Sequence, residues 1–231
     1  MGDNKRVGKH RPHWKCRRLF MKKNERKLTE KELKRKEQFE ILRADMQKNG
    51  YKEKTLTIGV LQANVGAIFV MLPFIAVTSI IYFNVNPVGA GEISIRFSMF
   101  LIPILLVLTV LHELIHGLVW SCFSRNHFHS IEFGVIWEAL TPYCTCSEPM
   151  RKWQYILGTV MPTLVLGAGI WAIGVATSQL LLFVIGELMI FSGGGDFLII
   201  LKILLYPSGS KETVYYDHPY ECGVVVFEKR P

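Results

Sequence analysis

The stretch His112-Glu113-Leu114-Ile115-His116 has the pattern H-E-x-x-H, and it lies inside a long apolar run. On a helix, side chains four residues apart share one face, so the two imidazoles can bind one metal ion. Glu113 is displaced around the helix, yet it can still reach a water on that ion. Zinc with such a glutamate beside it generates a nucleophilic water near neutral pH. The stretch therefore predicts a zinc-dependent hydrolytic site on a helix.

A membrane helix that carries two packed histidines is the structural alternative to a metal site. Ionisable side chains inside the hydrocarbon are costly, and they usually mark a functional position. With this composition, the expected number of chance matches to the pattern is about one in a hundred. Both considerations favour the metal site over simple packing.

The charge is divided unevenly along the 231 residues. Residues 1–54 contain 19 Lys and Arg against 8 Asp and Glu, whereas residues 55–231 contain 8 against 11. Half of the chain is hydrophobic, at 50% of residues. This pattern indicates a basic head on an apolar body, as in a membrane protein.

The body contains four apolar runs, each long enough to cross about 30 Å of hydrocarbon. We predict an all-α membrane protein with about four transmembrane helices, a small cytoplasmic β hairpin and an N-terminal amphipathic helix. The runs cover residues 55–83, 97–123, 153–177 and 180–206. The predicted domains are a basic cytoplasmic segment (1–54), a four-span metalloprotease domain (55–206) and a cytoplasmic tail (207–231).

The positions of Lys and Arg predict the orientation of the spans. The basic head lies on the same side as the loop that carries Arg125, Arg151 and Lys152. The connection 84–96 has a single Arg at its edge, and the turn at Ser178 has no basic residue. Because basic loops stay in the cytoplasm, we expect a multi-pass protein of the cell membrane with both termini cytoplasmic.

Residues 1–27 are dominated by Lys and Arg. Such a segment binds either nucleic acid or anionic lipid. No zinc-finger or helix-turn-helix pattern accompanies it, and its long charged start does not fit a signal peptide. We therefore expect anionic lipid as its partner and no nucleic acid.

A helix is predicted from Thr29 to about Lys48, before Asn49-Gly50. Thr29 and Glu32 have the spacing of a capping box. Phe39, Leu42 and Met46 share one side of this helix, with charged residues elsewhere. The pattern indicates an amphipathic helix at the membrane interface, and a solvated helix is the alternative.

A hydrolytic zinc site needs a third protein ligand, and depth in the membrane selects it. The second and fourth runs cross in the same direction, and Asp196 lies about as far into the fourth as the histidines lie into the second. Glu187 is nine residues shallower, about 13 Å, and points the other way. Three glycines precede Asp196, and they permit close backbone approach. A neutral carboxyl in a packing patch is the alternative.

Several polar residues outside the spans remain reserve ligands. They are His127, His129, His218 and Glu138. Residues 129–146 favour β structure, with partial alternation between Ser130 and Trp137. A hairpin there could approach the metal and offer an edge to an extended peptide, or it could be a plain cytoplasmic hairpin.

The layout resembles the site-2 protease class of intramembrane zinc proteases. H-E-L-I-H-G, R-K-W-Q-Y-I-L-G and S-G-G-G-D are more similar still to a bacterial family of zincin-type membrane peptidases. The resemblance covers roughly residues 97–227. It implies His112, His116 and Asp196 as zinc ligands and Glu113 as the catalytic base. The Asn-Pro-containing D-G motif usual in the site-2 class is absent at the third ligand, so no oxyanion-stabilising residue carries over.

These observations predict a membrane-embedded zinc endopeptidase whose substrate is a peptide or a membrane protein. A non-enzymatic metal-binding or transport protein could use the same residues, but it needs ligands at successive depths. An inactive scaffold would not need Glu113. The sequence leaves the oligomeric state undetermined.

Overall fold

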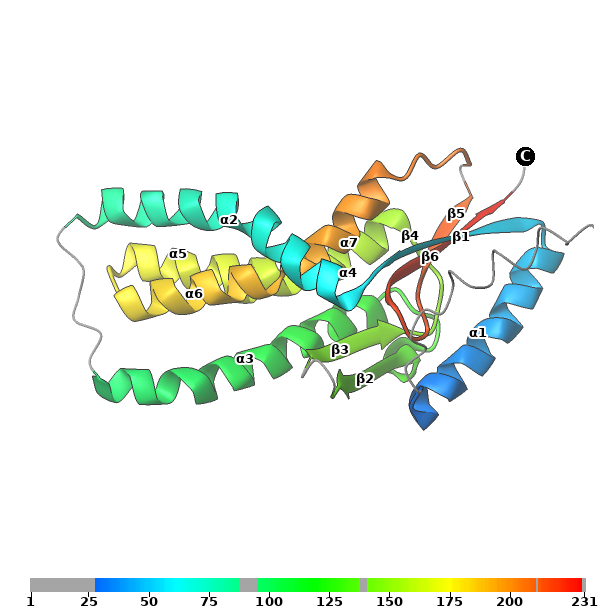
Figure 1. The fold of residues 1–231 in the computed structure, drawn as a ribbon, viewed down its shortest axis with the longest axis horizontal. Coiled ribbons are helices and arrows are strands. Elements are labelled where there is room, and N and C mark those ends of the chain that lie inside the picture. The colour runs from blue at the N-terminus through cyan, green and yellow to red at the C-terminus, as the bar shows by residue number, and fades with distance from the viewer. Residues whose placement is uncertain (1–27, 88–94, 138–140, 211, 230–231) are drawn as a thin grey trace, which may run out of the picture.

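The computed structural model describes residues 28–87, 95–137, 141–210 and 212–229. Helices dominate the fold, and two small antiparallel sheets gather at one end (Figure 1). The helices are α1 (Glu30–Lys48), α2 (Val60–Val85), α3 (Ile95–Ser121), η1 (His127–Ser130), α4 (Lys152–Pro162), η2 (Thr163–Ala168), α5 (Gly169–Ala176), α6 (Leu180–Ser192) and α7 (Gly194–Leu205). The strands are β1 (Tyr51–Ile58), β2 (Ile131–Ile136), β3 (Thr141–Cys146), β4 (Met150–Arg151), β5 (Thr213–Asp217) and β6 (Cys222–Lys229).

Three helical segments in the described residues are long and apolar enough to cross a membrane. They are Leu61–Val85, Met99–Ser121 and Lys152–Ala176. Helices α6 and α7 form a fourth if they are counted as one span, bent by 43°. Large apolar side chains such as Phe69 and Phe100 are exposed on α2 and α3. A contiguous apolar surface of this kind fits a lipid environment.

The four-stranded sheet joins the start of the body to the C-terminal tail. Its strand order is β1-β6-β5-β4, and all pairs are antiparallel. We predicted that the first span begins at Thr55. That start is wrong, because Thr55 to Ile58 pair with β6 and the helix begins at Val60. Alternating β-branched residues and a partner strand favour β structure there.

Helix α1 begins and ends where the sequence predicted. Thr29 and Glu32 form the capping box. The environment of its apolar side differs from the prediction, since Phe39 packs against Tyr216 and Phe227 of the sheet. Burial against an apolar sheet face removes more surface from water than contact with headgroups. This side of α1 is therefore a protein interface.

The third and fourth runs form a helical hairpin around the tight turn at Ser178. The third contains the π-helical turn η2, and the fourth breaks at Gly193. We predicted one transmembrane helix for each run. Backbones approach closely at Gly186, where a Cβ would lie within 2.7 Å of Trp171. Small residues at such contacts allow helices to pack tightly in membranes.

Candidate metal centre

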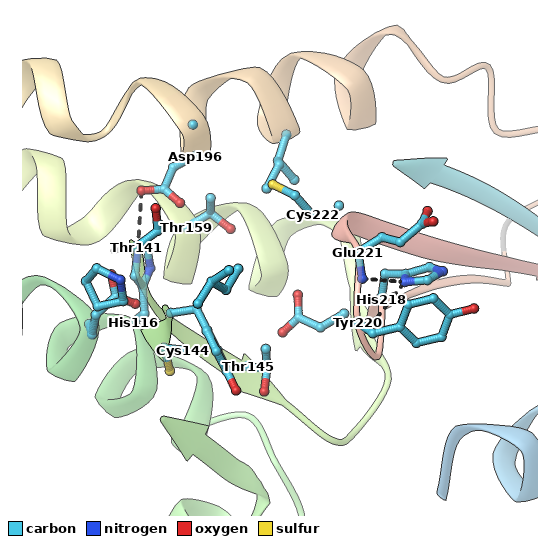
Figure 2. Close-up of a pocket in the computed structure, with 18 of the residues that line it drawn as sticks. His116, Thr141, Cys144, Thr145, Thr159, Asp196, His218, Tyr220, Glu221 and Cys222 are labelled. Carbon is cyan, nitrogen blue, oxygen red and sulfur yellow. Dashed lines mark hydrogen bonds and ion pairs between the residues drawn. The ribbon is translucent and has the colours of Figure 1, made fainter. Parts of the chain in front are cut away.

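Two buried histidines face the same side of α3. His112 and His116 are 6% and 4% exposed, and their ring centroids lie 4.9 Å apart. This is the spacing expected for residues one helical turn apart. The Nε2 atoms of both rings lie next to Asp196 of α7, and Figure 2 shows His116 pointing toward Asp196.

Asp196 reaches these histidines from the first turn of α7. Its Oδ2 atom lies 3.1 Å from His112 Nε2 and 3.4 Å from His116 Nε2. The bend before α7 depends on close contacts: a Cβ at Gly193 would overlap Thr163, and one at Gly194 would lie 2.7 Å from Ala67. The glycine run therefore lets α7 start between its neighbours and directs the carboxylate at the two imidazoles.

The orientation of His116 is fixed by a second hydrogen bond. Its Nδ1 atom lies 2.8 Å from the carbonyl oxygen of Gly158, which can only accept, so Nδ1 carries the proton. The lone pair of Nε2 is then available toward Asp196. Trp120 stacks on the imidazole at 5.2 Å and 18°. An outer hydrogen bond of this type orients a metal-binding histidine.

The three side chains fit a zinc ion. Ligand atoms around a tetrahedral zinc lie about 3.3 Å from one another, close to the distances between Oδ2 and the two Nε2 atoms. Two imidazoles and one carboxylate are also a donor set that suits zinc. Among the described residues, His112, His116 and Asp196 are the single group that could hold a metal ion.

Glu113 lies in the same cavity but outside this group. It is partly exposed to the cavity, and its carboxylate accepts a hydrogen bond from the backbone N–H of Cys144 in β3. Strand β3 therefore passes directly beside the H-E-x-x-H helix. The hairpin predicted in residues 129–146 is confirmed as β2 and β3, with Phe133 opposite Cys144.

The cavity has a volume of about 380 Å³ and connects the histidines with the sheet end of the protein. At the inner end, Thr109, Ser192 and Gly195 surround the His112–Asp196 group. At the outer end, it is bounded by α1, β3 and the loop between β5 and β6. Figure 2 shows Asp196 and His116 at one end and His218, Tyr220 and Glu221 at the other.

Asp217 links the elements that surround the cavity. Its carboxylate accepts hydrogen bonds from Tyr155 Oη at 2.5 Å and from the Cys146 N–H at 2.7 Å. Burial raises the pKa of Asp217 to about 6, although these two donors favour the charged form. Burial also raises the pKa of Cys146 to about 11, so this thiol stays protonated at neutral pH. The bonds to Asp217 hold β3 against α4.

The other candidate ligands lie elsewhere. Glu187 accepts a long 3.5 Å hydrogen bond from Ser79 and does not line the cavity. His218 lines the cavity at its outer end, where its Nδ1 accepts from the Glu221 N–H. His127 is bound to the Ser121 carbonyl, and His129 lies in η1. Glu138 lies outside the described residues.

Sequence reasoning missed four residues that support the site: Trp120, Tyr155, Gly158 and Asp217. Trp120 follows His116 by one helical turn, so its place on the same face was visible. Tyr155 and Gly158 lie within the R-K-W-Q-Y-I-L-G stretch, but nothing in their spacing relates them to α3. Asp217 lies in the tail, and no pattern in the sequence relates it to α4 or β3.

Residues 105–211 match the model of a protein family described as "Putative zincin peptidase". The matched segment contains all four residues of the predicted site: His112, Glu113, His116 and Asp196. The match supports a zincin-like peptidase family and suggests a zinc metallopeptidase. No curated protein and no solved structure matches the chain.

Proposed function

We propose that this protein is a membrane-embedded zinc endopeptidase, similar in layout to the site-2 protease class. The observation that carries the proposal is the convergence of two buried imidazoles and a carboxylate with Glu113 in the same cavity. A metal store or scaffold does not require a carboxylate beside the ligand set. Glu113 therefore favours hydrolysis over simple metal binding.

Each residue has a distinct role in the proposed reaction. His112, His116 and Asp196 would hold zinc, which supplies a Lewis acid and makes water nucleophilic near neutral pH. Glu113 accepts a proton from the attacking water and donates it to the leaving amine nitrogen. The bond from Cys144 N–H positions the Glu113 carboxylate.

Strand β3 lines the cavity and, in this proposal, binds an extended peptide through the backbone carbonyl groups of its outer edge. The N–H groups of Cys144 and Cys146 point away from β2, since they bind Glu113 and Asp217. Pro142, two residues earlier, has no N–H, so a peptide on this edge would pair with carbonyl groups of β3 and not with its N–H groups. A peptide paired with β3 would run along the cavity past the metal ligands. We propose a peptide or membrane-protein substrate bound in this way.

The membrane supplies the setting of the proposed reaction. The candidate spans place the ligand set within apolar helices, and the cavity provides a route for water. We further propose that both termini are cytoplasmic in the cell membrane and that the basic residues 1–27 contact anionic lipid.

Glu113→Gln tests the proposal, with Glu187→Gln as a matched control. Both carboxylates lie in spans, but only Glu113 lines the cavity. The purified proteins are placed in lipid vesicles with a panel of single-span membrane proteins and casein, and new termini are identified by mass spectrometry.

We expect Glu113→Gln to keep its zinc and to lose cleavage by a factor of about 10² to 10⁴, while Glu187→Gln cleaves like the wild type. Equal cleavage by the wild type and Glu113→Gln would overturn the proposed role of Glu113. Zinc uptake into vesicles by Glu113→Gln, with no cleavage by any variant, would identify a transporter instead.

A further inference from the structure

Helix α1 buries one stripe of side chains, which is charged in one half and apolar in the other. Glu32, Arg35 and Phe39 are all less than a tenth exposed, and they follow one face of the helix. The stripe is charged toward the N-terminus and apolar toward the C-terminus, where Leu42 and Met46 continue it. Buried charged residues are uncommon unless they are paired or functional.

The apolar half of the stripe is a firm anchor. Phe39 lies 5.4 Å from the ring of Tyr216 and 6.3 Å from that of Phe227. Val225 completes this cluster, and it is fully buried. Removing these apolar side chains from water is favourable, so the contact holds the C-terminal half of α1 on the sheet.

In the charged half, Arg35 makes the contacts with β3. Arg35 donates to Thr145 Oγ1 at 3.3 Å and to Tyr143 Oη at 3.0 Å, and it lies over the Tyr143 ring. Its Nε has no hydrogen-bond partner among the described residues and lies 3.8 Å from Glu132. A buried guanidinium with two neutral partners and one distant carboxylate gains little over its solvated state.

The charged half of the stripe lies over the cavity. Both Glu32 and Arg35 line it, together with Tyr143 and Thr145 of β3. The N-terminal end of α1 lies on the side of the β2–β3 hairpin, whereas its C-terminal end leads to β1 (Figure 1). A peptide that binds along β3 must therefore pass beneath Glu32 and Arg35.

We propose that the N-terminal half of α1 is a lid over the active-site cavity, with Arg35 as its latch on β3. The lid controls access to the proposed peptidase site. Its role in regulating cleavage therefore rests on the proposed function. Opening breaks the two bonds of Arg35 and exposes its guanidinium to water. Phe39 and the residues after it remain on the sheet and act as the hinge.

A native thiol in the cavity reports the state of the lid without any need for proteolysis. Cys222 lines the cavity and is partly buried, whereas Cys122 is exposed beyond it. The full-length protein in detergent is treated with N-ethylmaleimide, and labelling of each cysteine is followed by peptide mass spectrometry. The ratio of the Cys222 rate to the Cys122 rate measures cavity access.

The variants are Arg35→Ala and Arg43→Ala. Arg43 is the matched control because it anchors the same helix through Glu53 at 2.6 Å, yet it does not line the cavity. We expect Arg35→Ala to raise the ratio about fivefold to tenfold, as expected for losing the net contribution of one ordinary hydrogen bond. Arg43→Ala should leave the ratio unchanged.

An unchanged ratio in Arg35→Ala overturns the lid, and so does an equal increase in both variants, because that would mean general loosening of α1. The unfolding temperature of each variant shows that it is folded. An increase confined to Arg35→Ala supports the lid even if no substrate is cleaved, in which case the proposed function fails separately.

Discussion

Gly158→Ala perturbs the support of His116 without touching a metal ligand. A Cβ at this position would overlap three atoms of the Trp120 indole, of which Cε2 is the most distant at 2.8 Å. The indole must move, and it would lose its stacking on His116 and its 3.3 Å hydrogen bond to the Tyr155 carbonyl.

The expected cost follows from these contacts. Overpacking of a core costs about 1–3 kcal/mol, and the lost hydrogen bond adds about 1 kcal/mol. Displacement of the Gly158 carbonyl also loosens the bond that orients His116. Loss of such an outer contact lowers metal affinity about 10- to 100-fold. We therefore predict a less stable protein that binds zinc more weakly.

Gly195→Ala is the matched control, because a Cβ there meets nothing within 4 Å. It lies beside Asp196 in a helix, where alanine is favoured over glycine by about 1 kcal/mol. Zinc affinity is measured by competition with a chelator of known affinity, and stability by thermal unfolding in detergent. Wild-type zinc affinity in Gly158→Ala, or an equal loss in both variants, would refute the reasoning.

Two further predictions concern the sheet end of the protein. Gly223→Ala should destabilise the protein by about 3 kcal/mol or more, because Gly223 has a φ of 134° and its Cβ would overlap the Leu56 carbonyl. Gly50→Ala, at a φ of 85° with open space around it, should cost only about 1–2 kcal/mol; equal losses in thermal unfolding would contradict this account. Because burial raises the pKa of Asp217 to about 6, the metal-free protein should lose about 2 kcal/mol of stability as the pH rises from 4 to 6. Asp217→Asn should lack this dependence in unfolding measured across that range, and an unaltered pH profile would show that another group causes it.

The sequence was most informative where local periodicity was enough. The i and i+4 histidines and the rise per residue of a helix sufficed to select Asp196 over Glu187, and the structure brings Asp196 next to both histidines. The capping box of α1 was equally local. Such features depend on residues that are close in the chain, or on how far along its helix each residue lies.

Long-range pairing was not predictable in the same way. Residues Thr55 to Ile58 were assigned to a helix because they precede an apolar run, whereas their partner strand lies more than 160 residues later. The position of Arg35 over β3 and of Asp217 between α4 and β3 depends on the same long-range packing. Side-chain type alone does not reveal such partners.

Metal content tests the central claim most directly. Elemental analysis is performed on detergent-purified wild type, His116→Ala and Asp196→Ala, each shown to be folded. We predict about one zinc ion per wild-type chain and loss of zinc in both variants. Zinc retained in Asp196→Ala, or a folded wild-type protein that binds no metal after incubation with zinc, would contradict the account.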